Sequence, residues 1–160
     1  MNDTPRSTSD KRWRRQPKLP DDVFAAWQKL KGALNPSSVV ATIDEDGSPR
    51  TAPFGSIRAV SPSLLRFIVR LNHDTFTNLK RDSRVMVAMV CPPNLAVSVR
   101  GAARIVEEPF SADEQYALVE VDISEVKNDM PTRIEIDSGI TIAPGGPFVE
   151  WWNTLWEKLQ

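Results

Sequence analysis

Short runs of β-branched and other apolar residues, each ended by turn-forming residues, fill the middle of this 160-residue chain. The turns between these runs are short, and Asp46-Gly47 among them is a typical hairpin signal. Closely spaced strands with few helices predict a mainly β fold, a small closed barrel with flanking helices, whose closure would remove exposed strand edges. The expected strands are Ser38–Ile43, Arg50–Arg58, Leu64–Leu71, Arg84–Val90 and Leu95–Val106.

Helical patterns flank and interrupt these strands. Ser111, followed by Glu114 three residues later, forms a capping-box pattern and suggests a helix that begins nearby. The segment 128–140 is ambiguous and could hold a short strand at Arg133–Ile136, and Ile140–Ala143 is expected to be a strand. The expected helices are Pro20 to Leu34, Phe76 to Arg81, Phe110 to about Val126, and a Trp-rich amphipathic helix over Phe148–Leu159.

Composition bounds the class of protein. Apolar residues make up 41% and charged residues 26%, which fits one globular domain. No apolar run is long enough for a membrane-spanning helix, and the N-terminal residues lack the apolar stretch of a secretory signal. With one cysteine, Cys91, and one histidine, His73, the sequence excludes an internal disulfide and a multi-histidine metal centre. We therefore expect a cytoplasmic protein with no bound metal and no membrane partner.

Charge is distributed unevenly along the chain. Residues 1–20 carry six basic and two acidic groups, whereas the rest of the chain has a net charge of −5. A basic arm can contact nucleic acid, but an acidic body would not reinforce that contact. We expect residues 1–19 to be a flexible basic arm, residues 20–160 to be a single domain, and nucleic acid not to be a partner.

Several well-known catalytic motifs are missing from the sequence. It has no Gly-x-Ser-x-Gly elbow, no Gly-x-x-x-x-Gly-Lys-Ser/Thr phosphate loop and no Gly-x-Gly-x-x-Gly fingerprint. Cys91 ends an apolar strand and is interpreted as a small buried hydrophobe.

What remains is the stretch from Arg50 to Arg84, whose first strand contains Pro53 and Gly55. Proline cannot donate a ladder hydrogen bond, and glycine in a strand often marks a bulge or a close approach by another group. A helix that starts near Asn72–Thr75 would present free amides to a phosphate, although Asp74 would repel it.

Three blocks of this stretch resemble the pyridoxamine 5′-phosphate oxidase-like family of flavin-binding split barrels. Ala41–Pro53 is similar to the opening of that family, Asn78–Val85 resembles its "NL-x-x-DPRV" segment with Ser83 in place of the usual proline, and Val97–Arg104 resembles its "VRVRGxA" strand. The three blocks occur in family order and spacing across about residues 37–107.

The resemblance implies a homodimer of six-stranded antiparallel split barrels, with two FMN sites at the subunit interface. FMN would lie across the strand that matches Arg50–Ser56, and its phosphate would meet the turn that matches Val69–Thr75. The residues implied for the ring and ribityl chain are Arg50, Thr51, Ala52, Pro53 and Phe54. Those implied for the phosphate end are Val69, Arg70, Asn72, His73, Thr75 and Asn78.

Two departures from the family pattern bear on function. Family members often carry basic residues just before the short helix, where this chain has Asp74-Thr75, so charge for a phosphate would have to come from Arg70 or His73. The true pyridoxamine phosphate oxidases end in an Arg-rich segment that holds substrate. This chain instead ends in a Trp-rich segment without arginine, which disfavours vitamin B6 oxidation.

Three hypotheses for function follow. The first is an FMN-dependent oxidoreductase acting on a small molecule, with no side chain identifiable as a general acid or base. The second keeps the fold and replaces FMN by a deazaflavin. The third is non-enzymatic: a flavin-binding or haem-binding protein, or an interaction module. Trp152 packs on the barrel in one interpretation and covers a flavin face or a flat substrate in the other.

Overall fold

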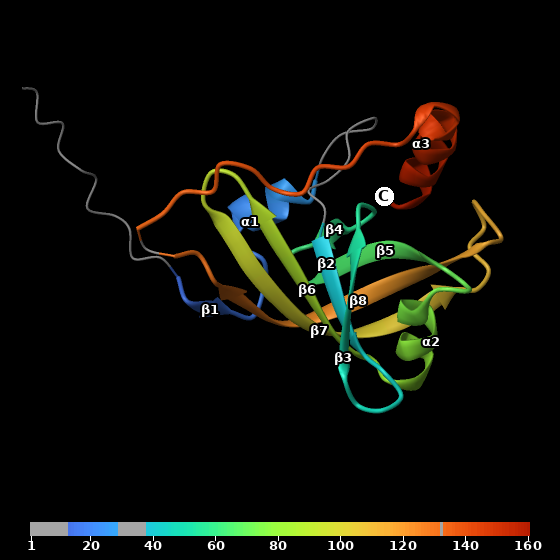
Figure 1. Ribbon diagram of the computed structural model, residues 1–160, viewed down its shortest axis with the longest axis horizontal. Helices are drawn as coiled ribbons and strands as arrows, with labels where there is room; N and C mark the ends of the chain where they lie inside the picture. Colours follow the sequence, from blue (N-terminus) through green and yellow to red (C-terminus); the bar gives the residue numbers. More distant parts are fainter. Residues whose placement is uncertain (1–12, 29–37, 132) are drawn as a thin grey trace, which may run out of the picture.

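The computed structural model describes residues 13–28, 38–131 and 133–160 (Figure 1). Its strands are β1 (Arg15–Gln16), β2 (Ser38–Ile43), β3 (Pro49–Phe54), β4 (Arg58–Ser61), β5 (Leu64–Arg70), β6 (Arg84–Cys91), β7 (Leu95–Glu107) and β8 (Tyr116–Asn128). Its helices are α1 (Asp21–Ala26), α2 (Asp74–Arg81) and α3 (Val149–Lys158), and a single 3₁₀ turn, η1 (Gly146–Phe148), precedes α3. In this part of the chain no helix is long and apolar enough to cross a membrane.

All eight strands belong to one antiparallel sheet in the order β3-β2-β6-β7-β8-β5-β4, with β1 pairing to β8 off this path. The mainly β split-barrel fold is therefore confirmed, with eight strands instead of six. The ladder is not closed by hydrogen bonds, in contrast to the closed barrel predicted from the pattern. Its two end strands, β3 and β4, are joined by residues 55–57 alone, so the chain itself links the two edges of the curled sheet.

The predicted strand Arg50–Arg58 is divided because the chain bends after Phe54. Ser56 fastens the bend to β5: its Oγ accepts a hydrogen bond from the amide of Ile68 (3.3 Å) and donates one to the same residue's carbonyl (3.4 Å). After the bend, β4 pairs with β5 and no longer with β2. The Pro53–Gly55 segment thus lies at a corner of the sheet.

The predicted helix from Phe110 to Val126 is wrong, because most of this segment is strand β8. Ala117, Val119 and Val121 alternate into the core, and β-branched residues at period two favour a strand over a helix. The capping-box residues lie instead in a turn, where the amide of Tyr116 donates to the carbonyl of Asp113 (3.0 Å).

The predicted strands at Arg133–Ile136 and Ile140–Ala143 are also not formed, and the described residues between β8 and η1 have no regular structure. A strand needs a ladder partner. Here the amide of Asp129 donates to the carbonyl of Ala96 (2.8 Å) and the amide of Ile136 to the carbonyl of Pro93 (2.8 Å), beside the β6–β7 turn, and these isolated bonds do not form a ladder. In Figure 1 the segment runs in orange past the end of the β6–β7 hairpin towards α3.

The N-terminal predictions hold in part. Helix α1 is shorter than the predicted Pro20–Leu34, and residues 29–37 lie outside the described residues. Of the predicted arm, residues 1–12 also lie outside them. Arg15–Gln16 pairs with β8, and Leu19 is buried in the core, so this end of the arm is part of the fold.

The C-terminal helix is confirmed, and so is its packing. Trp152, Trp156 and Leu159 are buried against Ile68 and Leu118 on the outer face of β5 and β8. Arg66 of β5 holds the end of the helix, because it donates to the carbonyl of Gln160 (2.9 Å) and pairs with Glu120 (2.6 Å). Helix α3 is thereby fixed beside the corner of the sheet at Gly55.

Candidate functional site

Most of the predicted site residues fall into two regions at the two ends of β3. The first region, the charged hollow, has a volume of about 340 Å³ and contains Arg50 and Asn78. The second, the aromatic cavity, has a volume of about 230 Å³. The predicted residues that line the cavity are Pro53, Phe54, Val69, Arg70, His73 and Trp152. Neither region takes in Thr51, Ala52, Asn72 or Thr75.

Strand β3 connects the two regions along an open edge of the sheet. In the described part of the chain it pairs with β2 alone, in a register that sets Arg50 opposite Thr42 and Phe54 opposite Ser38. The far side of an edge strand carries backbone N–H and C=O groups that have no ladder partner. Pro53 is tolerated here because an edge strand does not need every amide. A planar ligand could use the remaining backbone groups.

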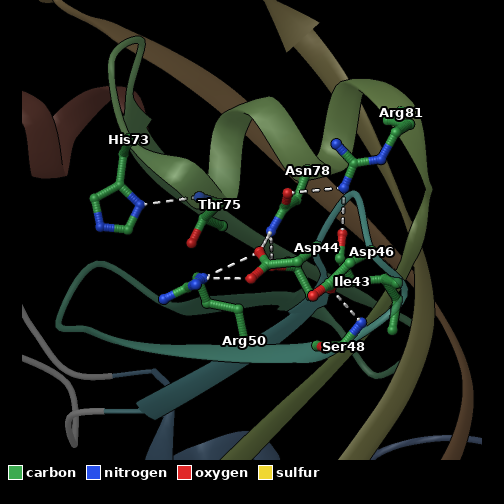
Figure 2. A network of polar contacts seen from close by, with 10 residues as sticks. Ile43, Asp44, Asp46, Ser48, Arg50, His73, Thr75, Asn78 and Arg81 are labelled. Atoms are coloured by element: carbon green, nitrogen blue, oxygen red, sulfur yellow. Dashed lines mark hydrogen bonds and ion pairs between the residues drawn. The ribbon is translucent and has the colours of Figure 1, made fainter.

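Asp44 is the centre of the charged hollow (Figure 2). Its carboxylate accepts two hydrogen bonds from Nε of Arg50 (2.7 and 3.0 Å) and one from Nδ2 of Asn78 (2.8 Å). These contacts join the β2–β3 hairpin to helix α2. They also direct the Arg50 guanidinium towards its own hairpin.

Asn78 is buried and fully engaged. Its Nδ2 also donates to Oγ1 of Thr42 (3.1 Å), and its Oδ1 accepts from Nη2 of Arg81 (2.9 Å). The same Arg81 nitrogen donates to the carbonyl of Ile43 (2.6 Å). Both arginines of the hollow and its one buried amide therefore already have partners within the chain.

The electrostatics of the hollow oppose an added anion. The hydrogen bond from Asn78, together with Arg50, lowers the pKa of Asp44, and hydrogen bonds from Ser48 lower the pKa of Asp46. Glu45 and Asp74 also line the hollow. At neutral pH four carboxylates thus face two guanidinium groups, and a phosphate there would meet net negative charge.

At the start of helix α2, backbone amides are likewise hydrogen-bonded within the chain. His73 is the N-cap, and its Nδ1 accepts a hydrogen bond from the amide of Thr75 (3.1 Å). The amide of Phe76 donates to the His73 carbonyl (3.0 Å), and the Thr75 side chain is buried. The amides of Thr75 and Phe76 therefore already have acceptors within the chain.

The aromatic cavity lies between the corner of the sheet, the end of β5, the start of α2 and helix α3. The Phe54 ring meets His73 edge to face (5.8 Å between centroids) and packs on Phe67 of the core (5.2 Å). On the other side, Tyr116, Trp151 and Trp152 form a chain of ring contacts, with centroids 5.5 and 6.1 Å apart. Five aromatic side chains thus form the walls.

The polar groups of the cavity are mostly donors, and no carboxylate lines it. Arg70 extends beside the Tyr116 ring (5.8 Å) and donates to Oε1 of Gln115 (2.8 Å). Burial raises the pKa of the Tyr116 hydroxyl, so it stays protonated. The Trp151 indole donates to Asp113 (2.6 Å), whereas Nε1 of Trp152 is buried with no hydrogen-bond partner among the described residues.

Another group lies close to Gly55, as the position of this glycine in a strand predicts. That group is the side chain of Ile142 from the same chain. A Cβ at Gly55 would lie 2.1 Å from Cδ1 of Ile142. The segment before α3 therefore lies over the corner of the sheet and fills part of the groove expected for a flavin. Ile142 is still about half exposed, so it closes the groove from the solvent side.

The arrangement fits one part of a flavin better than the other. The open edge of β3 and the aromatic walls suit a flat ring system, although at about 230 Å³ the cavity is smaller than the roughly 300–1,000 Å³ of typical cofactor pockets. The charged hollow does not suit a phosphate. No group of three or more metal-binding side chains is present in the described ranges.

Four residues that matter here are absent from the sequence-based site. Asp44 lies next to the predicted turn at Asp46-Gly47, inside a family-like block. Tyr116 falls within the predicted helix from Phe110 to Val126. Ile142 and Trp151 contact the cavity through the tertiary fold, and no pattern in the sequence indicates that position. Cys91, at the end of β6, lines neither region.

Comparisons with known proteins agree on fold. A family model described as pyridoxamine 5′-phosphate oxidase matches residues 27–137. A Lactobacillus delbrueckii protein provisionally named a pyridoxamine 5′-phosphate oxidase shares 24% identity over 71% of this chain and 98% of its own, with a TM-score of 0.59. Two further proteins share the fold. An F420 reductase is 16% identical over 68% of this chain and 98% of its own, with a TM-score of 0.55. HupZ of group A Streptococcus is 18% identical over 68% of this chain and 91% of its own, with a TM-score of 0.52. No curated protein matches the sequence.

Proposed function

We propose, from the premise that this chain belongs to the pyridoxamine 5′-phosphate oxidase family, that it is a flavin-dependent oxidoreductase acting on a small molecule. The observation that carries the proposal is the placement of β3. This strand is an open edge of the sheet, and its Phe54 end leads into an aromatic cavity. A flat ring system along that edge would reach the cavity.

In this proposal the protein orients the ring and shields it. Backbone groups of Arg50–Phe54 would hydrogen-bond the ring edge, and Phe54 and His73 would contact its face or rim. When bound, the flavin would supply hydride or electron transfer, a chemistry that side chains do not offer. Ile142 would have to move aside for a tricyclic ring, because it fills the groove at Gly55.

The cofactor is proposed to be FMN, with a deazaflavin as the alternative, and its ring is proposed to contribute most of the affinity. Arg50 and Asn78 already bind Asp44, and the hollow around them is acidic. A terminal phosphate would therefore add little. An acidic deazaflavin tail would meet the same repulsion.

A second candidate function is favoured by Ile142. Because this side chain occupies the groove at Gly55, the fold could serve as a binding or interaction protein that takes up a flavin or haem without turnover, or takes up neither. Absence of any bound chromophore in freshly purified protein, and no stabilisation by added flavin, would favour this candidate.

The expected homodimer remains a proposal. A groove of about 760 Å³, mostly apolar, crosses β2, β6, β7 and β8, and the exposed Met86 lies in it. Its rim carries both signs of charge, with Arg84 and Arg100 near Asp122, so two copies related by a two-fold axis could pair opposite charges. Sedimentation of Met86→Glu tests the contact, with Val106→Glu, equally exposed but outside the groove, as the control.

The cofactor assignment is tested on freshly purified protein. Mass spectrometry of the released chromophore, with its absorbance spectrum, distinguishes the two-banded flavin from the single-banded deazaflavin. Added FMN at 100 times its Kd should stabilise the fold by about 2.7 kcal/mol. FMN and riboflavin should bind with similar affinity. A strong preference for FMN would contradict the proposed weak role of the phosphate.

A further inference from the structure

Three residues that line the aromatic cavity lie outside the family match. The family match ends at residue 137, whereas Ile142, Trp151 and Trp152 come after it. Helix α3 is nevertheless firmly attached, through its buried face and through Arg66. Two of the aromatic walls therefore belong to a well-packed element that the family pattern does not describe.

The cavity is open to solvent, and its volume indicates how much of a ligand it can surround. A cavity of about 150 Å³ with apolar walls can hold benzene. At about 230 Å³, this cavity accommodates one six-membered ring with one or two small substituents. With Ile142 in place, a tricyclic ring system does not fit inside it.

The walls favour a flat ligand. Phe54 and His73 meet edge to face on one side, and Trp151 and Trp152 lie with tilted rings on the other. Aromatic rings gain stabilisation from offset or edge-to-face contact with another ring. These rings are held by contacts with the core and with α3, so little conformational entropy would be lost on binding.

The polar groups select a ligand that accepts hydrogen bonds. Arg70 uses one nitrogen for Gln115 and keeps other N–H groups. Because Nδ1 of His73 accepts from the Thr75 amide, the proton of a neutral His73 lies on Nε2. Trp152 contributes its ring to the wall, because its Nε1 is buried away from solvent. No carboxylate lines the cavity, and Asp113 lies behind Trp151, whose indole donates to it, so Arg70 supplies the positive charge at the wall.

We infer that the aromatic cavity binds a single-ring aromatic carboxylate, whose carboxylate pairs with Arg70 and whose ring lies between Phe54 and Trp152. The pairing of a carboxylate with a guanidinium is the strong, directional contact that these donors allow. That this ligand is also the redox substrate rests on the proposed function, since the cavity opens at the end of β3 where the flavin ring would lie.

Benzoate is the probe for the test, and benzyl alcohol is its neutral counterpart. Titration into the full-length protein is followed by calorimetry and by the imidazole NMR signals of His73, the one histidine of the sequence. Benzoate should bind and shift these signals. Arg70→Gln should weaken benzoate binding about tenfold or more and change benzyl alcohol binding less than about twofold. Arg70→Lys should recover part of the loss.

Two matched controls separate the cavity from general effects. Arg15→Gln removes an exposed arginine on another strand and should leave benzoate binding unchanged. Trp152→Phe reduces the ring surface of the wall and should weaken benzoate about threefold, whereas Trp156→Phe, at an indole outside the cavity, should not. If wild-type protein fails to bind benzoate, or if Arg70→Gln and Arg15→Gln lose affinity equally, the inference is overturned.

The two assignments are tested in separate samples, because the proposed flavin and benzoate would both contact Phe54. FMN is titrated into a separate sample of the same preparation. Benzoate binding without flavin binding would keep the inference and overturn the proposed function. Flavin binding without benzoate binding would do the reverse.

Discussion

The charged hollow and the aromatic cavity flank the same strand and use their polar groups in opposite ways. In the hollow, Asp44, Asn78 and both arginines are engaged with one another. In the cavity, Arg70 keeps free donors and Trp152 has a buried donor with no described partner. The hollow therefore acts as a structural joint, because its hydrogen bonds would have to break before a ligand could use them.

This difference changes how the family-like residues are interpreted. Arg50 and Asn78 are among the residues that the family resemblance assigns to the cofactor, but both side chains are hydrogen-bonded to Asp44 of the same chain. The residues that remain available to a ligand are gathered at the other end of β3, beside a helix that lies outside the family match.

The largest expected loss of stability comes from removing the hydrogen bonds of Asn78 in the charged hollow. Asn78→Leu removes hydrogen bonds to Thr42 and Asp44 and the acceptor of Arg81, and should lower the free energy of unfolding by about 2–3 kcal/mol. Urea denaturation measures this loss. Thr77→Ala, an exposed position on the same helix, should cost less than about 0.5 kcal/mol. A loss for Asn78→Leu as small as that of the control would show that the hollow is not a joint.

The next effect concerns the cover over the cavity. Gly55→Ala places a methyl group 2.1 Å from Cδ1 of Ile142, so that side chain must move, at a cost of about 1 kcal/mol. Ile142→Ala should remove most of this cost, with a coupling energy of at least about 0.5 kcal/mol in a double-mutant cycle. Gly145→Ala, whose Cβ would meet no atom within 4 Å, is the control. Additive free energies would contradict the contact.

A smaller difference in stability is expected between substitutions of two neighbouring tryptophans, Trp151 and Trp152. Trp151→Phe takes a donor from Asp113, whereas Trp152→Phe removes a donor that bonds to no described group. Both changes lose similar ring volume, so Trp151→Phe should be less stable than Trp152→Phe by about 1 kcal/mol. Thermal unfolding of both variants tests this order, and the reverse order would mean that Trp152 has a partner.

The smallest expected effect is a change in acid stability. The pKa of Asp44 is lowered from 3.8 in the folded chain, so its hydrogen bonds stabilise the fold above about pH 4 and are lost as the pH falls through the lowered value. The Asp44→Asn variant has no carboxylate at this position, so it lacks this pH-dependent stabilisation. Its unfolding midpoint should therefore fall less than that of the wild type between pH 5 and about pH 2. Parallel curves would mean that Asp44 is not stabilised in the hollow.

Sequence patterns predicted the elements whose residues carry a local signal. The hairpin at Asp46-Gly47, the short helix after His73 and the C-terminal tryptophan helix all have such signals, and all are formed. The capping-box pattern at Ser111 predicts a helix where strand β8 forms, and the alternation of Ala117, Val119 and Val121 is the signal that favours the strand. Ile140–Ala143 has the composition of a strand but lacks a partner, which no local pattern reveals.

The sequence by itself determined the family and the mainly β fold, because strand periodicity and motif spacing are local properties. It also predicted a set of ligand-contacting residues, and only the tertiary structure decided which of those residues are available. Asp44 engages Arg50 and Asn78, and Ile142 covers Gly55, through contacts between residues far apart in the chain. A side chain's availability depends on which partners the fold brings to it, and that depends on packing across the whole sheet.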